Sequence, residues 1–202
     1  METEEEEQER IRKNKEVFKK THPQIFSFSD NASSFDEHID KSIRGFADLR
    51  EDVAQLSRFF VKSNSSVLEL GCSQGTTLRR IRDENSDHAK DVFYHGIDIN
   101  SAFEPSWKVP NEPEMRFKKM DAEELKVGEN FEEYSHLRLV VSIFTMQFLF
   151  EENRPSIFQN IYNHLPIGGG FILAEKVLSE FSRIQNMMDS MQLQFKRQNF
   201  TD

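Results

Sequence analysis

Residues 67–78 (VLELGCSQGTTL) join a short apolar run, a loop and the beginning of a helix-compatible stretch. The first four residues predict a short buried strand, and Gly71 and Gly75 bound the loop that follows. Glycine suits such a loop because a Cβ atom would hinder both a turn with positive φ and the close approach of a ligand. A strand, a tight glycine turn and a helix N-terminus together direct backbone N–H groups towards a polar ligand. The segment therefore predicts a ligand-binding loop at the end of a strand.

Strand-like and helix-like segments alternate through the rest of the chain. Four further apolar runs predict strands, at residues 92–98, 115–120, 137–144 and 171–175. Helical spacing of apolar residues predicts helices at 76–82, 151–165 and 181–197, whereas the polar residues 83–91 and the proline-containing residues 101–113 read as loops or a much-shortened helix. This alternation predicts an α/β protein with a mostly parallel sheet covered on both faces, a Rossmann-like three-layer fold.

The N-terminal third of the chain contains a charged segment and helical patterns but no predicted strand. Residues 1–22 are densely charged and are expected to form a flexible arm. Residues 23–62 contain two amphipathic helical patterns broken near Gly45, and they predict a helical cap over a sheet edge or a pocket. With the α/β core at 63–202, we expect one domain spanning residues 23–202.

Composition limits the classes of partner. The 202 residues carry a formal net charge of −9, which argues against a direct nucleic-acid partner. The six histidines have no metal-ligand spacing, so no metal is expected. The single cysteine, the acidic N-terminus and the lack of a long apolar run predict a cytoplasmic protein without a membrane partner.

Two common nucleotide-binding motifs are absent from the glycine loop, and their absence excludes two classes of ligand. A dinucleotide site needs glycines spaced G-x-G-x-x-G, but Ser73 and Thr76 stand at the third and sixth positions, and no P-loop pattern is present. Asp98 ends the second predicted strand, where its carboxylate can accept both hydroxyls of a ribose. Asp121 ends the third predicted strand, and the cap of a following helix is a rival role for it.

The glycine loop and these two acids resemble the cofactor site of class I S-adenosylmethionine-dependent methyltransferases, over about residues 26–201. In that family, Gly71 would line the amino-acid end of the cofactor, Asp98 would hold its ribose, and Asp121 and Ala122 would contact its adenine. The resemblance implies a transferase that binds S-adenosylmethionine and a small-molecule ligand, with no catalytic residue assigned. The implied cofactor-binding residues are Phe46, Glu69, Gly71, Cys72, Ser73, Gly75, Asp98, Ile99, Asp121, Ala122 and Ile143.

Within this family the chain is most similar to the carboxy-S-adenosylmethionine synthases. The similarity lies in residues 26–46, 144–149 (FTMQFL) and 161–170 (IYNHLPIGGG). It implies transfer of carbon dioxide derived from prephenate to the methyl group of the cofactor. The product would be the carboxylated form of S-adenosylmethionine, used for modification of tRNA wobble uridine.

Several positions depart from that group. Phe46 stands in place of a tyrosine and Ile143 in place of an asparagine, while the group's carboxylate-binding arginine and last two strands would lie beyond Asp202. We expect Lys176 or Arg183 to be the nearest replacement cations. Two alternatives stay open: an ordinary methyltransferase acting on a small molecule, and an inactive cofactor-binding module that works through a partner.

The same departures predict that the chain is C-terminally short, which affects strand five. This strand would be an exposed edge, or be covered by the last helix or by a partner chain, as in a homodimer. Met187, Met188 and Met191 share a helical spacing that is typical of core packing. Trp107 is expected to pack a loop or to close over the pocket, and Cys72 to be a packing residue.

Overall fold

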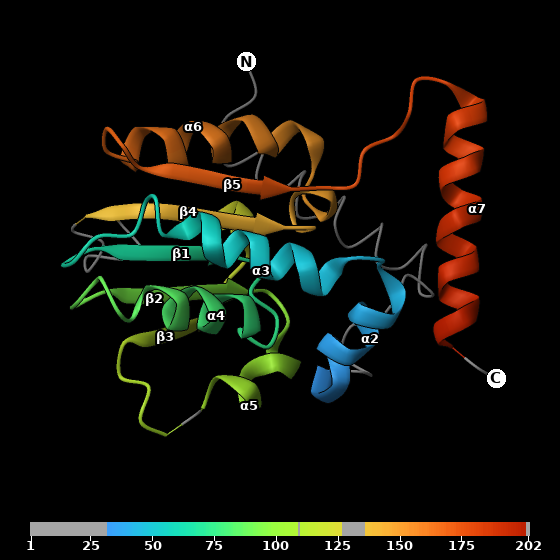
Figure 1. Ribbon diagram of the computed structural model, residues 1–202. Helices are drawn as coiled ribbons and strands as arrows, with labels where there is room; N and C mark the ends of the chain where they lie inside the picture. The colour runs from blue at the N-terminus through green and yellow to red at the C-terminus, as the bar shows by residue number, and fades with distance from the viewer. Residues whose placement is uncertain (1–31, 109, 127–135, 201–202) are drawn as a thin grey trace, which may run out of the picture.

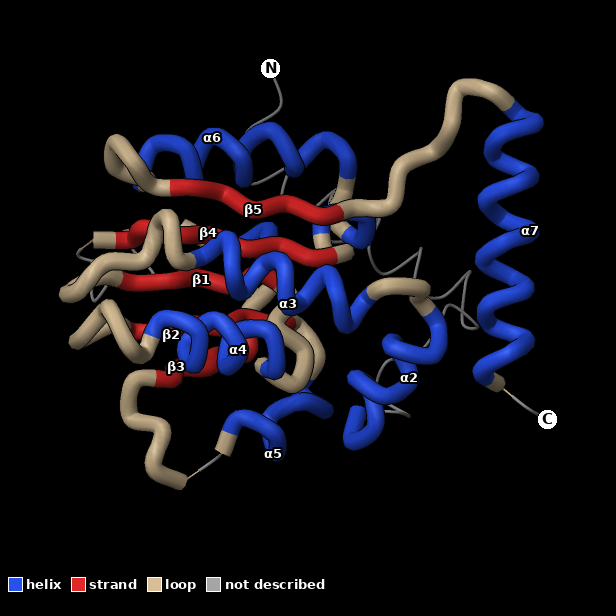
Figure 2. The backbone as a smooth tube through the Cα atoms, in the orientation of Figure 1, coloured by secondary structure: helices blue, strands red, loops and turns tan. Residues whose placement is uncertain are grey.

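The computed structural model describes residues 32–108, 110–126 and 136–200. These residues form a five-stranded sheet in which every neighbouring pair is parallel (Figures 1 and 2). The order across the sheet is β3-β2-β1-β4-β5, so the winding reverses between β1 and β4. The strands are β1 (Ser66–Leu70), β2 (Phe93–Asp98), β3 (Met115–Lys119), β4 (Leu137–Ile143) and β5 (Gly170–Ala174). The α/β fold class predicted from the sequence is confirmed.

Helices cover both faces of this sheet. The described helices are α2 (Phe35–Ser42), α3 (Phe46–Ser57), α4 (Thr76–Asn85), α5 (Glu104–Trp107), α6 (Arg154–His164) and α7 (Ser182–Asn199), of which α3 and α4 pack on one face of the sheet and α6 on the other. Single 3₁₀ turns lie at Ser101–Phe103, Ala122–Glu124, Met146–Phe148 and Glu151–Asn153. Helices α3 and α4 bury Val53 and Ile81 in one core cluster, and α6 buries Ile157 in a second cluster. The expected three layers are therefore present.

Strand β1 lies at the centre of the sheet, and all five of its residues are buried. Its side chains alternate between the faces, so Val67 belongs to the α3/α4 cluster and Leu68 and Leu70 to the α6 cluster. Such an apolar run, covered on both sides, is typical of a parallel strand. It brings the glycine loop to the point where the winding of the sheet reverses, which is where open α/β sheets bind ligands.

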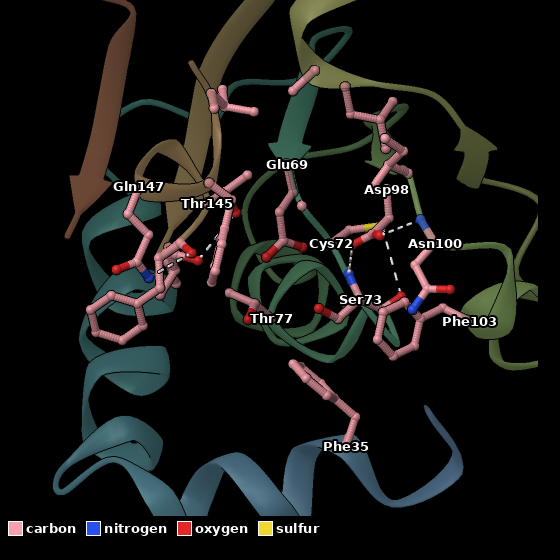
Figure 3. Close-up of a pocket in the computed structure, with 18 of the residues that line it drawn as sticks. Phe35, Glu69, Cys72, Ser73, Thr77, Asp98, Asn100, Phe103, Thr145 and Gln147 are labelled. Carbon is pink, nitrogen blue, oxygen red and sulfur yellow. Dashed lines mark hydrogen bonds between the residues drawn. The ribbon is translucent and has the colours of Figure 1, made fainter. Parts of the chain in front are cut away.

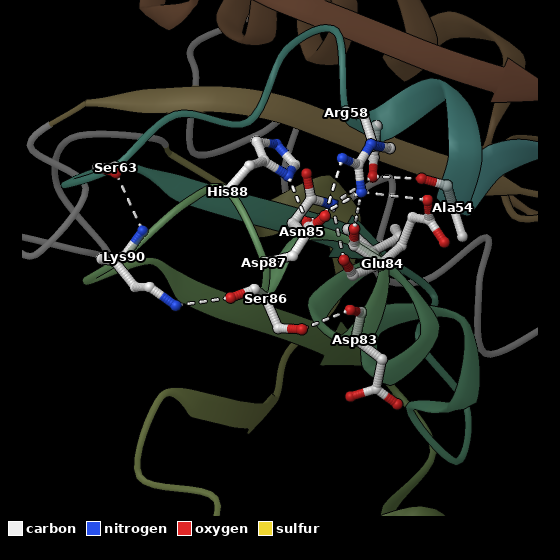
Figure 4. A network of polar contacts seen from close by, with 12 residues as sticks. Ala54, Arg58, Ser63, Asp83, Glu84, Asn85, Ser86, Asp87, His88 and Lys90 are labelled. Atoms are coloured by element: carbon white, nitrogen blue, oxygen red, sulfur yellow. Dashed lines mark hydrogen bonds and ion pairs between the residues drawn. The ribbon is translucent and has the colours of Figure 1, made fainter.

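Helix α4 is longer than the sequence predicts. The helix continues through Asn85 instead of ending at Arg82, so the expectation of a loop from residue 83 is wrong for its first three residues. The side chain of Asn85 is fully buried and donates to Ser57 Oγ (2.6 Å) and Ile81 O (2.7 Å). Arg58 donates to Glu84 O (2.6 Å) and to the Asp87 carboxylate (3.0 Å), as Figure 4 shows. These contacts with α3 stabilise a polar helix end that sequence alone does not mark.

We expect Asn85→Ala to lower the free energy of unfolding by roughly 1–3 kcal/mol, because buried polar partners lose a donor that water does not replace. Urea denaturation monitored by circular dichroism measures this difference. Ser86→Ala is the matched control, since its exposed hydroxyl bonds only to Asp83 O. Equal stabilities for the two variants would contradict a role for the Asn85 contacts in joining α3 to α4.

Helix α7 does not lie over strand five, where one of the expectations from the sequence placed the last helix. β5 is the edge strand of the described sheet, and α7 lies beside α2, away from β5 (Figure 1). Gln192 of α7 donates to Ser42 O, and no residue of α7 is buried. The last helix therefore does not cover strand five. The methionines of α7 at positions 187, 188 and 191 are more than half exposed, so their assignment to the core is wrong.

Within the described residues, no helix is long and apolar enough to cross a membrane.

Candidate functional site

A cavity of about 640 Å³ lies at the carboxyl ends of the strands, between the glycine loop and helix α2 (Figure 3). Helix α2 belongs to the predicted cap, and it lines the cavity with Phe35, Asp36 and Ile39. All of the cofactor-binding residues expected from the resemblance line this cavity except Gly75. They are Phe46, Glu69, Gly71, Cys72, Ser73, Asp98, Ile99, Asp121, Ala122 and Ile143. The structure brings these residues together, and their contact with a cofactor stays a prediction.

The two glycines of the loop have different roles. Gly71 has φ +69°, and an added Cβ would lie 2.7 Å from Thr145 Cγ2. Its N–H donates to Ile97 O (2.8 Å), which fixes the loop against β2. Gly75 has φ +80° at the N-terminus of α4, and an added Cβ would lie 2.6 Å from the ring of Phe117. Gly75 thus shapes the turn from outside the cavity, whereas Gly71 forms part of the cavity wall.

Asp98 holds the loop together at the end of β2. Its Oδ2 accepts from the Ser73 N–H (2.9 Å), and its Oδ1 accepts from the Asn100 N–H (2.9 Å). Burial raises the pKa of Asp98, while these two backbone hydrogen bonds favour its charged form. Each carboxylate oxygen has a further lone pair, so the group can also accept from hydroxyls in the cavity.

Trp107 supports the same loop from outside the cavity. Its Nε1 donates to Ser73 O (2.7 Å), and its ring stacks on Phe117 with 5.9 Å between ring centroids. Trp107 is not among the residues that line the cavity. Of the two roles expected for it, loop packing is therefore the one that the structure supports.

Glu69 is a buried carboxyl group in the cavity wall. It lies on β1, is 3% exposed, and its Oε2 has no hydrogen-bond partner. Burial raises its pKa to about 8; a hydrogen bond from Thr77 opposes this shift, and the charges of Asp36 and Asp98 add to it. Cys72 is also buried, and burial together with nearby Glu69 raises the pKa of its thiol. A thiol with a raised pKa is a poor nucleophile, which agrees with a packing role.

Asp121 has both of the features expected of it. Its Oδ1 accepts from the Glu123 N–H (3.0 Å) and so caps the 3₁₀ turn that follows β3. It also lines the cavity together with Ala122. The capping bond orients the carboxylate at the cavity wall, so capping does not exclude contact with a ligand.

Residues from distant segments also reach the cavity, although the sequence does not predict their contacts. Thr145 follows β4, and its Oγ1 donates to Leu70 O (3.0 Å) beneath the glycine loop. Phe144 stacks on Phe46, with 6.0 Å between ring centroids. Gln74 accepts from the Asp36 N–H (3.1 Å) and donates to Ser33 O (3.2 Å), which binds the loop to the cap. The sequence marks only residues 144–149, through their similarity to the carboxy-S-adenosylmethionine synthases, and it does not indicate these contacts.

The charged side chains of the described residues that line the cavity are all acidic. Among the described residues, the wall contains no lysine, arginine or histidine. Its ionisable carboxyl groups are Asp36, Glu69, Asp98, Asp121, Glu123 and Glu151. Lys176 and Arg183, the replacement cations expected from the sequence, do not line the cavity. No cluster suited to a metal ion occurs in the described part of the chain.

A family model described as a methyltransferase domain matches residues 68–171, which include the end of β1, the glycine loop, Asp98, Asp121 and strands β2 to β4. The chain belongs to this methyltransferase family. Two carboxy-S-adenosyl-L-methionine synthases are similar to this methyltransferase. The protein of Shewanella oneidensis is 30% identical over 181 residues, covering 88% of this chain and 72% of its own length. That of Staphylococcus epidermidis is 27% identical over 180 residues, covering 86% and 72%.

Among solved structures, DesVI of Streptomyces venezuelae shares the fold of this methyltransferase. It aligns with a TM-score of 0.55 and 20% sequence identity, over 74% of this chain and 59% of DesVI. The Rossmann-like methyltransferase fold expected from the sequence is thus confirmed. The methyltransferase is a transferase of the S-adenosylmethionine-dependent superfamily, and S-adenosylmethionine is its cofactor.

The residues of the cavity fit this cofactor. Gly71 lines the cavity without a side chain, the oxygens of Asp98 retain accepting capacity, and Glu69 presents an unpartnered oxygen suited to a cation. The bound cofactor supplies an activated methyl group. The chain supplies the loop, the acids and the aromatic walls that hold and orient it away from water.

Proposed function

We propose that this methyltransferase binds S-adenosylmethionine through the glycine loop and Asp98, and that it transfers a one-carbon group at the activated methyl of the cofactor. The observation that carries the proposal is Asp98, whose two oxygens bind the N–H groups of Ser73 and Asn100 beside the cavity. A carboxylate fixed in this way is pre-oriented for ribose hydroxyls. The fixed loop also holds the cofactor in one orientation for the transfer.

The first candidate reaction is carboxylation of the cofactor methyl group. The curated relatives carry this activity in their name and match 86–88% of this chain. The carboxylated product would then serve tRNA wobble uridine modification, as the resemblance implies.

The second candidate is ordinary methyl transfer to a small molecule. It is favoured by the acid-lined cavity wall, in which no described residue offers a cation to a carboxylate. An anionic group held without a cationic partner is unfavourable in a partly dry site, and the only side-chain amides of the described wall are those of Asn100 and Gln147. The two candidates thus differ in the charge of the second ligand.

Native mass spectrometry of the purified protein, before and after addition of S-adenosylmethionine and prephenate, tests the proposal. The mass of the carboxylated cofactor would support the first candidate. Bound S-adenosylmethionine that stays unmodified with prephenate would favour the second candidate. A protein that is empty and takes up no added cofactor would contradict both candidates and favour an inactive module.

We expect Asp98→Asn to weaken the binding of S-adenosylmethionine at least about tenfold, because hydrogen bonds to a charged acceptor contribute about 1.5–3 kcal/mol. Isothermal titration calorimetry measures the dissociation constant. Asp83→Asn is the matched control, since Asp83 lies on α4 outside the cavity wall. An unchanged dissociation constant for Asp98→Asn would place the cofactor elsewhere.

A further inference from the structure

Glu69 is the least satisfied polar group of the cavity wall. Its side chain is almost fully buried at the centre of the sheet, yet its Oε2 has no hydrogen-bond partner. Figure 3 shows the carboxyl group directed into the same space as Asp98 and Thr77. A buried carboxyl oxygen without a partner is costly, so this oxygen marks a place where a ligand group would fit.

The surroundings of Glu69 disfavour its ionised form in the ligand-free protein. Helix α4 provides two donors to it, the Thr77 hydroxyl and the Leu78 N–H. The titratable groups that face it are acidic: Asp36 on α2, Asp98 at the end of β2, and Cys72 on the loop. Burial and these negative charges together raise the pKa of Glu69 to about 8, so the empty site holds a neutral carboxylic acid at pH 7.

The guanidinium groups of Arg50 and Arg79 are already paired with other acids. Arg50 binds both oxygens of Asp40, with Nη2 at 2.9 and 2.8 Å, and its Nη1 lies 3.5 Å from Asp36 Oδ2. Arg79 binds Glu112, with Nε at 2.9 Å from Oε2. A positive charge that ionises Glu69 must therefore come with the ligand.

We propose that Glu69 couples the binding of a positively charged ligand group to the release of one proton. As the ligand enters, the O–H bond of the Glu69 carboxyl group breaks, its proton passes to the solvent, and the resulting carboxylate pairs with the ligand cation. This inference rests on the proposed function, because the cation is that of S-adenosylmethionine bound in the cavity.

The coupling also makes Glu69 a specificity-determining residue. S-adenosylmethionine and its carboxylated form have the same cationic groups, but the carboxylated form has one more carboxylate, which would repel an ionised Glu69. Opposite charges attract and like charges repel, and both effects are stronger in a buried site than in water. Glu69 therefore favours the cofactor over the carboxylated product, and it would weaken retention of that product.

Isothermal titration calorimetry with the full chain and S-adenosylmethionine tests the proposal. Titrations at pH 6 to 9, in buffers of different ionisation enthalpy, give the number of protons released per ligand. We expect nearly one proton to be released at pH 7 and none at pH 9. The association constant should rise about tenfold per pH unit below pH 8 and then level off. Glu69→Gln should release no proton and bind independently of pH, while the exposed control Glu180→Gln should behave as the unmodified protein.

Each result decides between distinct conclusions. Binding to the unmodified protein without proton release would overturn the coupling and leave the proposed function intact. Proton release that persists in Glu69→Gln would assign the coupling to another group and overturn it as well. No binding of S-adenosylmethionine at any pH would overturn the proposed function itself.

Discussion

Replacement of Glu69 by glutamine is expected to stabilise the ligand-free protein by up to about 5 kcal/mol at pH 9 and to change its stability little at pH 4 to 5. The pKa of Glu69 is raised in the folded protein from 4.5 to about 8. Between these values the folded state binds a proton that the unfolded state has released, so stability falls as pH rises through this window. Each unit of the difference corresponds to about 1.4 kcal/mol. Glutamine does not titrate, so the variant lacks this loss.

Urea unfolding at pH 5, 7 and 9 measures the effect as the difference between the variant and the unmodified protein. The difference removes contributions common to both proteins, such as that of buried His95, whose pKa burial lowers to about 4. Glu180→Gln is the matched control, because Glu180 is exposed and outside the cavity wall. Stability curves that stay parallel from pH 5 to pH 9 would show that Glu69 is ionised in the empty protein.

The elements around β1 were predictable because their causes are local. The apolar run before Gly71 predicts a strand buried on both faces, and parallel strands end at one edge of the sheet. Asp98 and Asp121 each follow an apolar run, so their convergence with the loop follows from topology alone. The expectation of a cofactor-sized pocket at this edge required no knowledge of tertiary contacts.

Other parts of the site depend on contacts between distant segments. Thr145 supports Gly71 from a position 74 residues later in the chain. Asp36 lies in the wall because Gln74 binds the backbone of α2. Gly75 has the spacing of a ligand residue, but its φ of +80° and its proximity to Phe117 make it part of the turn. The sequence pattern marks none of these contacts.

The exposed methionines of α7 show a second limit of prediction from sequence. Their helical spacing indicates one apolar face, and periodicity alone does not show whether this face packs on the same chain. In the structure α7 lies beside α2 and leaves Met187, Met188 and Met191 exposed. The homodimer expected from the sequence stays a prediction.

Alanine at Gly71 is expected to reduce the binding of S-adenosylmethionine about a hundredfold or more and to lower the free energy of unfolding by about 3 kcal/mol. Two costs add at this position. The backbone has φ +69°, which costs a residue with a Cβ about 1–2 kcal/mol. The new Cβ would also displace the side chain of Thr145, and overpacking of this kind costs about 1–3 kcal/mol. Because Gly71 lines the cavity, the displacement would distort the proposed cofactor cradle.

Gly45→Ala is a matched control for this prediction, because Gly45 also has positive φ (+76°) but no atom within 4 Å of an added Cβ. It lies between α2 and α3, outside the cavity wall. It should cost only about 1–2 kcal/mol of stability and leave the dissociation constant of S-adenosylmethionine within about threefold of the unmodified protein. Urea denaturation and calorimetric titration of both variants separate backbone strain from the clash with Thr145. Equal losses of cofactor affinity in the two variants would mean that the close packing of Gly71 against Thr145 does not shape the cofactor site.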